Sequence, residues 1–123
     1  MISPTRFCAS VGGNTAVEFA LVLPALAALI VGGLYTGLLV YSAAGLHSAV
    51  EQAARCYSVN STQCGSASAA QGYAQSQYFG INTPTFAAST TACGHQVTAT
   101  VTIAFSAVVT NVSVPLSAQA CFP

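Results

Sequence analysis

The sequence predicts an α+β protein: a long N-terminal helix that crosses a membrane, and a small head with a short helix and an antiparallel β-hairpin or sheet. Three observations predict this fold. The run from Phe19 to Tyr41 is apolar and contains no charged residue. Residues 60–95 are rich in Ser, Thr, Gln, Gly and Ala. From Val97 onward, apolar residues alternate with small or polar ones.

The composition narrows the possible functions. The chain has 123 residues, of which 54% are hydrophobic and 3% charged, whereas an ordinary soluble domain has about 25% charged residues. The charged side chains are Arg6, Glu18, Glu51 and Arg55, and the net charge is zero. Nucleic-acid binding is therefore not expected, because it requires a basic surface. A chain of this length is also too short for a large enzyme.

The apolar run FALVLPALAALIVGGLYTGLLVY covers residues 19–41. As a helix rising about 1.5 Å per residue it would be roughly 34 Å long, enough to cross a hydrocarbon layer of about 30 Å. Pro24 removes one backbone hydrogen bond and predicts a kink. Gly33 and Gly37 have the small-xxx-small spacing that lets another helix approach closely. The alternative is that these glycines reflect only the usual composition of membrane helices.

The helical pattern continues beyond the apolar run. Apolar residues keep helical spacing after residue 41, and Glu51 and Arg55 form an i,i+4 pair on the opposite side. We therefore expect one continuous helix from about Thr15 to about Cys56, which leaves the membrane near Ser42.

The following segment is polar and contains one more helical pattern. A short helix is predicted over Ser68–Phe79, with Ala70, Tyr73, Ala74 and Tyr78 on one face. Gly80 and the sequence Asn-Thr-Pro then end it. The stretch from there to Gly94 is predicted to be a loop.

Two strands are predicted at the C-terminal end. Residues 97–105 alternate strictly between apolar and polar or small side chains, as in a half-buried strand. A second alternation covers residues 112–122, after a turn near Thr110–Asn111. Pro115 cannot donate to a ladder and marks an edge or a strand start. The two strands are expected to form a hairpin or small sheet that packs on the upper part of the long helix.

The cysteines lie on both sides of the apolar run. Cys8 precedes it, and Cys56, Cys64, Cys93 and Cys121 follow it. If the C-terminal part lies outside the cytoplasm, the even count predicts two disulfides. Three connectivities are possible. We favour Cys56–Cys64, which closes a short loop after the helix, and Cys93–Cys121, which joins the ends of the hairpin.

No constellation for metal binding or catalysis is evident. His95 lies two residues from Cys93 and His47 is also available, but the cysteine spacing matches no zinc module. The chain contains no Asp, and both Glu residues lie on the long helix, so a Cys-His or Ser-His pair would lack an orienting acid. We expect no metal, no cofactor and no enzymatic activity.

The beginning of the chain carries a resemblance to a known family. A polar leader, MISPTRFCASVGG, is followed by Asn14 and then, just before the apolar run, by Glu18-Phe19. Residues 12–58 resemble the TadE-like proteins, pseudopilins of the tight-adherence pilus assembly system. These share a glycine five residues before Glu-Phe, an early proline in the helix and Ala-Ala-Arg near its end. The matching positions here are Gly13, Glu18-Phe19, Pro24 and Ala53-Ala54-Arg55.

The resemblance implies a pilin-like, single-pass protein of the bacterial inner membrane. A prepilin peptidase would remove a leader of residues 1–13 by cleaving between Gly13 and Asn14 on the cytoplasmic side. Arg6 favours a cytoplasmic N-terminus, because positive charges are retained on that side. The remaining chain would comprise a helix over residues 14–57, transmembrane over about 19–41, and a disulfide-linked periplasmic head over residues 58–123.

The resemblance also implies a role for Glu18. Cleavage would create an amino group at Asn14, about one helical turn away, and in pilin-like assemblies the acid pairs with the new amine of a neighbouring subunit. Leaving either charge alone in an apolar bundle is expensive, so the pair favours one packing register. Phe19 shares this position in the motif. The alternative is that Glu18 lies at the headgroup level and is solvated.

The function implied is structural. The chain would act as a minor pseudopilin in assembly of a Flp-type, type IV-like pilus used in cell adhesion. Its partners would be the prepilin peptidase, other pilin and pseudopilin subunits, the assembly platform and the inner membrane, with possible incorporation into the extracellular pilus. The sequence does not distinguish a minor subunit from a tip subunit or an abundant one. Major subunits of this pilus type are usually shorter, which favours a minor subunit. The alternative is a signal-anchored periplasmic binding or adhesion module that is neither processed nor assembled.

Overall fold

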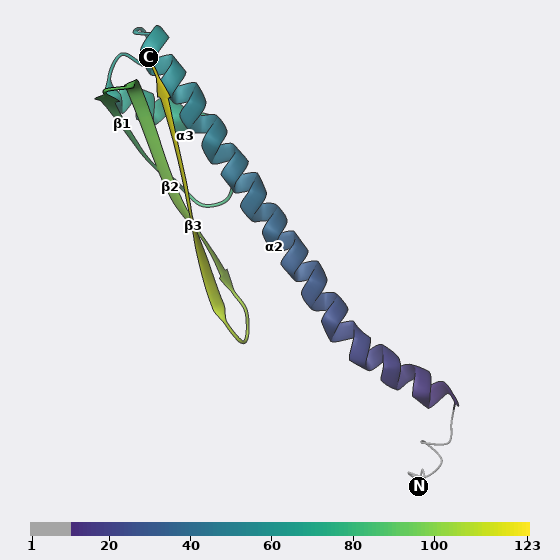
Figure 1. Cartoon of the computed structure of the whole chain (residues 1–123). Helices are drawn as coiled ribbons and strands as arrows, with labels where there is room; N and C mark the ends of the chain where they lie inside the picture. Colours follow the sequence, from purple (N-terminus) through teal and green to yellow (C-terminus); the bar gives the residue numbers. More distant parts are fainter. Residues whose placement is uncertain (1–10) are drawn as a thin grey trace. The chain divides into compact units, whose positions relative to one another are not determined.

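A computed structural model describes residues 11–123 of the chain, with side chains from Asn14 onward. The chain divides into two compact units, residues 1–36 and 37–123. The described residues form two helices and three strands (Figure 1): α2 (Val11–Val59), α3 (Ala67–Gln77), β1 (Thr85–Thr91), β2 (Gly94–Ser106) and β3 (Asn111–Phe122). The predicted α+β fold, with a long apolar helix, a short helix and an antiparallel sheet, is confirmed.

Helix α2 is longer than the sequence predicts. It begins at Val11 rather than near Thr15, and it ends at Val59 rather than near Cys56. Two consecutive glycines near its start weaken the helix by about 1 kcal/mol each relative to alanine, but they do not stop it. At the other end, the Asn60 backbone N–H donates to the Cys56 carbonyl at 2.8 Å, so helical bonding continues to the last turn.

The C-terminal part of α2 supplies one side of the core of residues 37–123. Its buried residues recur every three or four positions, as expected for one face of a helix: Ser42, Leu46, Ala49, Val50, Ala53, Ala54 and Cys56. Glu51 and Arg55 are exposed. Within residues 14–123 no ion pair joins them, so the expected i,i+4 pair does not form; such exposed pairs contribute only about 0.3–0.5 kcal/mol.

The three strands form an antiparallel sheet in the order β1-β2-β3. Along β2 the buried side chains are those of Val97, Ala99, Val101 and Ile103. Ala99 pairs with buried Phe86 of β1 and with buried Ala118 of β3, so these strands share one apolar face. The alternation predicted for residues 97–105 is therefore confirmed.

Strand β1 corrects the prediction of a loop as far as Gly94. Its sequence, TFAASTT, has one large apolar side chain, Phe86, with only 7% of its surface exposed. The other residues are small or polar, so their alternation is too weak to recognise. This edge strand forms through its pairing with β2. The tight turn between the two strands follows the pair Thr91↔Gly94. Gly94 has a φ of 122°, a backbone conformation that favours glycine.

The turn between β2 and β3 lies slightly before the predicted position. The Ala107 N–H donates to the Thr110 carbonyl at 2.8 Å, so the turn covers residues 107–110 instead of being centred near Thr110–Asn111. Beyond it β3 continues through Pro115 to Phe122. Pro115 is exposed, and β3 is an edge strand, as the proline indicates.

Helix α3 is two residues shorter at its C-terminal end than predicted. Ser66 caps its start by accepting a hydrogen bond from the Ala69 N–H at 3.2 Å. It ends because Tyr78 adopts an extended backbone, with φ −71° and ψ 131°. Ala70 and Ala74 are buried on the predicted face.

Candidate functional site

The predicted cleavage site lies within a helix. The bond between Gly13 and Asn14 joins the third and fourth residues of α2, which begins at Val11. The structure therefore has Gly13 inside the helix, whereas the sequence predicts a helix that begins only near Thr15. Of the predicted leader, residues 1–10 lie outside the described residues, and this includes Arg6 and Cys8.

Glu18 lies in the second turn of α2 and is exposed, as is Phe19, 65% of whose surface is accessible. Asn14 precedes Glu18 by four residues, and this spacing brings two side chains to the same face of a helix. Glu18 is also the only charged residue between positions 14 and 50. Its surroundings within the chain are thus apolar, with an amide side chain one turn away.

The apolar segment of α2 has no protein cover in the unit of residues 1–36. Its leucines are highly accessible, with Leu21 and Leu29 each 74% exposed. Within residues 11–123, α2 is the one helix that is long and apolar enough to cross a membrane. A helix that is apolar all round suits lipid or the centre of a helical bundle. It fits a single-pass membrane anchor.

The residues predicted for helix packing lie on this accessible helix. A methyl group added at Gly33 or at Gly37 would meet no other atom within 4 Å. The neighbouring Thr36 hydroxyl donates to the Gly32 carbonyl at 2.8 Å, so it is satisfied within the helix. The helix continues through Pro24. These positions leave room for the backbone of a second helix.

Comparison with known proteins decides the family of this segment. Residues 13–55 match the family model for TadE-like proteins. The long helix is TadE-like. The matched segment, about a third of the chain, runs from Gly13 through Glu18 and Pro24 to Arg55, so it contains the positions on which the resemblance was based. It indicates a protein associated with the tight-adherence pilus. No curated protein and no solved structure matches the chain.

The first disulfide fastens the end of the TadE-like helix to the head. Cys56 and Cys64 are bonded, with their Cα atoms 5.7 Å apart. Both are buried and form a cluster with Ala70 of α3, against which Tyr57 and Tyr73 pack. This bond closes the short loop after the helix, as favoured from the sequence.

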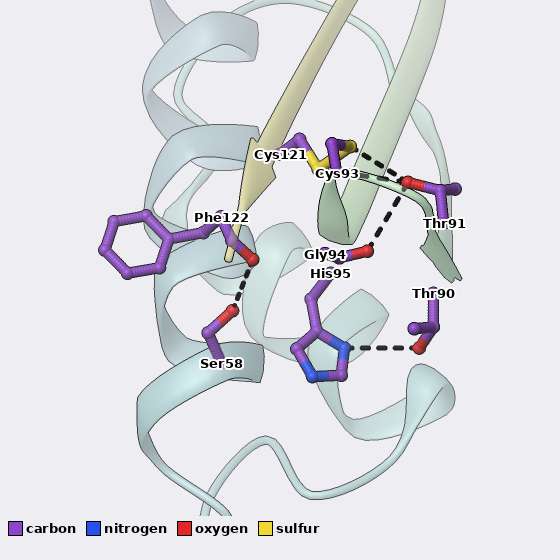
Figure 2. Close-up of a disulfide and its surroundings, with 8 residues drawn as sticks. All are labelled: Ser58, Thr90, Thr91, Cys93, Gly94, His95, Cys121 and Phe122. Carbon is purple, nitrogen blue, oxygen red and sulfur yellow. Dashed lines mark hydrogen bonds between the residues drawn. A yellow bond between two sulfur atoms is a disulfide. The ribbon is translucent and has the colours of Figure 1, made fainter.

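The second disulfide joins the turn before β2 to the end of β3. Cys93 and Cys121 are bonded, with a Cα–Cα distance of 6.3 Å. The Thr91 hydroxyl lies 2.9 Å from the Cys93 sulfur (Figure 2). The favoured connectivity is thus found for both bonds. All four cysteines that follow the apolar run are therefore disulfide-bonded.

The disulfide end of the sheet is also attached to the last turn of α2. The Ser58 hydroxyl donates to the Phe122 carbonyl at 2.8 Å (Figure 2). The rings of Tyr57 and His95 lie 4.1 Å apart between centroids. His95 Nδ1 is 3.3 Å from the Thr90 hydroxyl. His95 therefore has a packing role, and within the described residues no three His, Cys, Asp or Glu side chains gather to hold a metal ion.

A buried polar contact where α2 meets the head was not predicted from the sequence. Ser42 is fully buried, and its hydroxyl accepts from the Ile81 N–H at 3.3 Å. The Tyr78 hydroxyl donates to the Ile81 carbonyl at 2.9 Å. Burial raises the pKa of Tyr78, and the Ser42 side chain partly opposes this shift. A serine in an apolar helix gives no sign of such a contact, because its partner is 39 residues away.

Proposed function

We propose that this chain is a minor pseudopilin that acts structurally in assembly of a tight-adherence, type IV-like pilus. The observation that carries the proposal is Glu18, the single charge at the start of an uncovered apolar helix that matches the TadE-like family. An ionisable group at the edge of such a helix normally has a specific partner.

Processing supplies that partner in the proposal. A prepilin peptidase cuts between Gly13 and Asn14, which leaves an α-amino group one helical turn from Glu18. The first turn of α2 must open for cleavage, because the peptide bond lies inside the helix. Gly12 and Gly13 make this turn easier to open, since each glycine costs the helix about 1 kcal/mol relative to alanine.

The proposed orientation places the N-terminus in the cytoplasm and the head in the periplasm of a bacterium. Arg6 favours this direction through the retention of positive charge on the cytoplasmic side. The two disulfides of the head fit an oxidising compartment. The head also lacks any Asp, Glu, Lys or Arg after Arg55, so neighbouring copies would not repel one another.

Assembly then packs the apolar helices of several subunits together. Glu18 pairs with the α-amino group of a neighbouring subunit, because either charge alone would be costly in an apolar bundle. The open surface at Gly33 and Gly37 lets the neighbouring backbone approach closely. The partners are therefore other pilin and pseudopilin subunits, the assembly platform and the inner membrane. No enzymatic step is assigned to the chain itself.

Replacing Glu18 by Ala tests this proposal directly. We expect the variant to be inserted in the membrane at the normal level but to give few or no pili, because the new amine then lacks its partner. Glu51→Ala is the matched control, since it removes the other, exposed acid and should leave pili unchanged. Pili are counted by electron microscopy and membrane levels by immunoblot. Normal pili with Glu18→Ala would support the alternative of a signal-anchored module that does not assemble.

A further inference from the structure

A polar hollow lies between α3 and the first residues of β1. Its volume is about 520 Å³, which is within the range of roughly 300–1,000 Å³ that small-molecule sites have. All its lining residues lie between positions 68 and 86, inside the unit of residues 37–123. The proposed function uses none of them, so the hollow is a candidate site for a separate ligand.

One wall of the hollow is a polar face of α3. The lining residues of this helix recur at positions i, i+3, i+4 and i+7, which places them on one face: Ser68, Gln71, Gly72 and Gln75. Ala70 and Ala74, which are buried, lie on the opposite face. The Gln75 Nε2 donates to the Pro84 carbonyl at 3.4 Å, so this amide also connects α3 to the opposite wall.

The opposite wall runs from the segment before β1 into the strand itself. Pro84 is buried, and Phe86 has only 7% of its surface exposed, so these two residues give the hollow an apolar floor. Thr83 and Thr85, which are exposed, also line it and carry hydroxyl groups. The hollow therefore combines an apolar floor with hydroxyl and amide groups around it.

Gly72 is a weak point in α3 that the fold does not require. Glycine costs a helix about 1 kcal/mol relative to alanine, yet a methyl group added at Gly72 would meet no neighbouring group within 4 Å. Its backbone is helical, so a positive φ does not explain the glycine either. The missing side chain does have one effect, which is to leave the hollow open along α3.

The chemistry of the lining selects an uncharged ligand. The hollow is lined by no Asp, Glu, Lys, Arg or His, so a charged ligand would lose water without gaining an opposite charge. An entirely apolar ligand would leave amide and hydroxyl groups without hydrogen-bond partners, which costs about 1–3 kcal/mol for each buried group. A sugar ring meets both conditions. Its C–H face can lie on Pro84 and Phe86, and its hydroxyl groups can donate to and accept from Gln and Thr side chains.

We propose that the hollow between α3 and β1 binds a neutral saccharide. Several of its lining residues are exposed, so each site binds weakly, and firm attachment needs several heads on one surface. The inference goes beyond the proposed function. It requires neither cleavage after Gly13 nor assembly of a pilus, because every lining residue belongs to the head of a single copy.

An oligosaccharide array tests the proposal with the full-length chain. The protein is reconstituted in fluorescent phosphatidylcholine vesicles, which display many heads on one surface. The array carries neutral oligosaccharides of glucose, galactose, mannose and N-acetylglucosamine, together with sialylated and sulfated ones. We expect at least one neutral oligosaccharide to retain the vesicles and the charged ones to retain them no better. Vesicles without protein should not be retained.

Two substitutions of Gly72 link retention to the hollow. Gly72→Leu fills the space beside α3 and should lower retention about tenfold or more, as expected when a binding space is overpacked. Gly72→Ala is the matched control, because it gives α3 a similar gain in helix propensity but leaves most of the hollow open. Its retention should equal that of the unmodified chain. Thermal unfolding verifies that both variants fold.

A second pair of variants tests the site if Gly72→Leu does not fold. Gln71→Ala removes an amide from the wall of the hollow and should weaken retention. Gln77→Ala removes an amide of α3 that does not line the hollow and should leave retention unchanged. Weakening by both variants, or by neither, would contradict the proposed site.

Three results would overturn the inference: retention by no neutral oligosaccharide, stronger retention by charged ones, or unchanged retention of a folded Gly72→Leu chain. Glu18→Ala separates the inference from the proposed function, since that variant should give few or no pili but bind the neutral oligosaccharide normally. A Glu18→Ala chain with normal pili would contradict the proposed function and leave the saccharide site unaffected.

Discussion

Single residues on α2 have different roles that their type does not reveal. Gly33 and Gly37 lie on open surface, whereas an added methyl group at Gly45 would overlap the Phe79 carbonyl. From the sequence alone, Gly45 is indistinguishable from the other glycines of the helix. Its requirement comes from a backbone segment more than 30 residues later in the chain, which only the folded head brings into contact.

Gly45→Ala should therefore destabilise the head. Overlap with the Phe79 backbone costs about 1–3 kcal/mol in overpacking, which outweighs the gain of about 1 kcal/mol in helix propensity. Gly72→Ala is the matched control, because Gly72 lies in α3 with no atom near the added methyl group, and it should raise stability. Thermal unfolding of the detergent-solubilised chain, followed by near-UV circular dichroism, measures both. A Gly45→Ala protein as stable as Gly72→Ala would contradict the contact.

Glu18 can be identified as a candidate site residue from the sequence alone. Its rarity in an apolar segment and its spacing from Gly13 single it out without a structure. Its neighbours within the chain add little, because the proposed partner of its carboxylate belongs to another subunit. The cysteine pairing could also be predicted, since one bond closes a short loop and the other joins the ends of a hairpin.

Elements were predictable where one periodicity dominates. The unbroken apolar run predicts α2, and strict alternation predicts β2. Strand β1 could not be predicted in this way, because Thr, Ala and Ser give no difference in hydrophobicity between its two faces. The strand forms through its pairing with β2. The helix α2 begins earlier than the sequence predicts, because weak helix formers such as Gly12 and Gly13 lower helix stability without setting a boundary.

The two disulfides connect different elements and should differ in their resistance to reduction. Cys93 is exposed, whereas Cys56 and Cys64 have only 8% and 0% of their surface accessible. Since thiol exchange requires access to a sulfur atom, Cys93–Cys121 should be reduced first. Limited reduction under native conditions, followed by alkylation and peptide mapping, gives the order. Prior reduction of Cys56–Cys64 would show that the packing around α3 opens more readily than the sheet end.

The described chain combines a disulfide-linked head with a helix that is long and apolar enough to cross a membrane. Apart from the hollow between α3 and β1, the head gives no functional assignment, since it has no charged residue after Arg55 and no metal-binding cluster within the described residues. The proposed function rests on residues 13–55, which match the family model for TadE-like proteins. We propose that this helix enters a polymer after the leader has been removed.

The intact mass of the chain, purified from bacterial membranes, shows whether the leader is removed. Two strains are compared, one with an active prepilin peptidase and one without it. We expect a mature chain that begins at Asn14 in the first strain, and a longer chain that retains the leader in the second. A chain that begins at Met1 in both strains would contradict it.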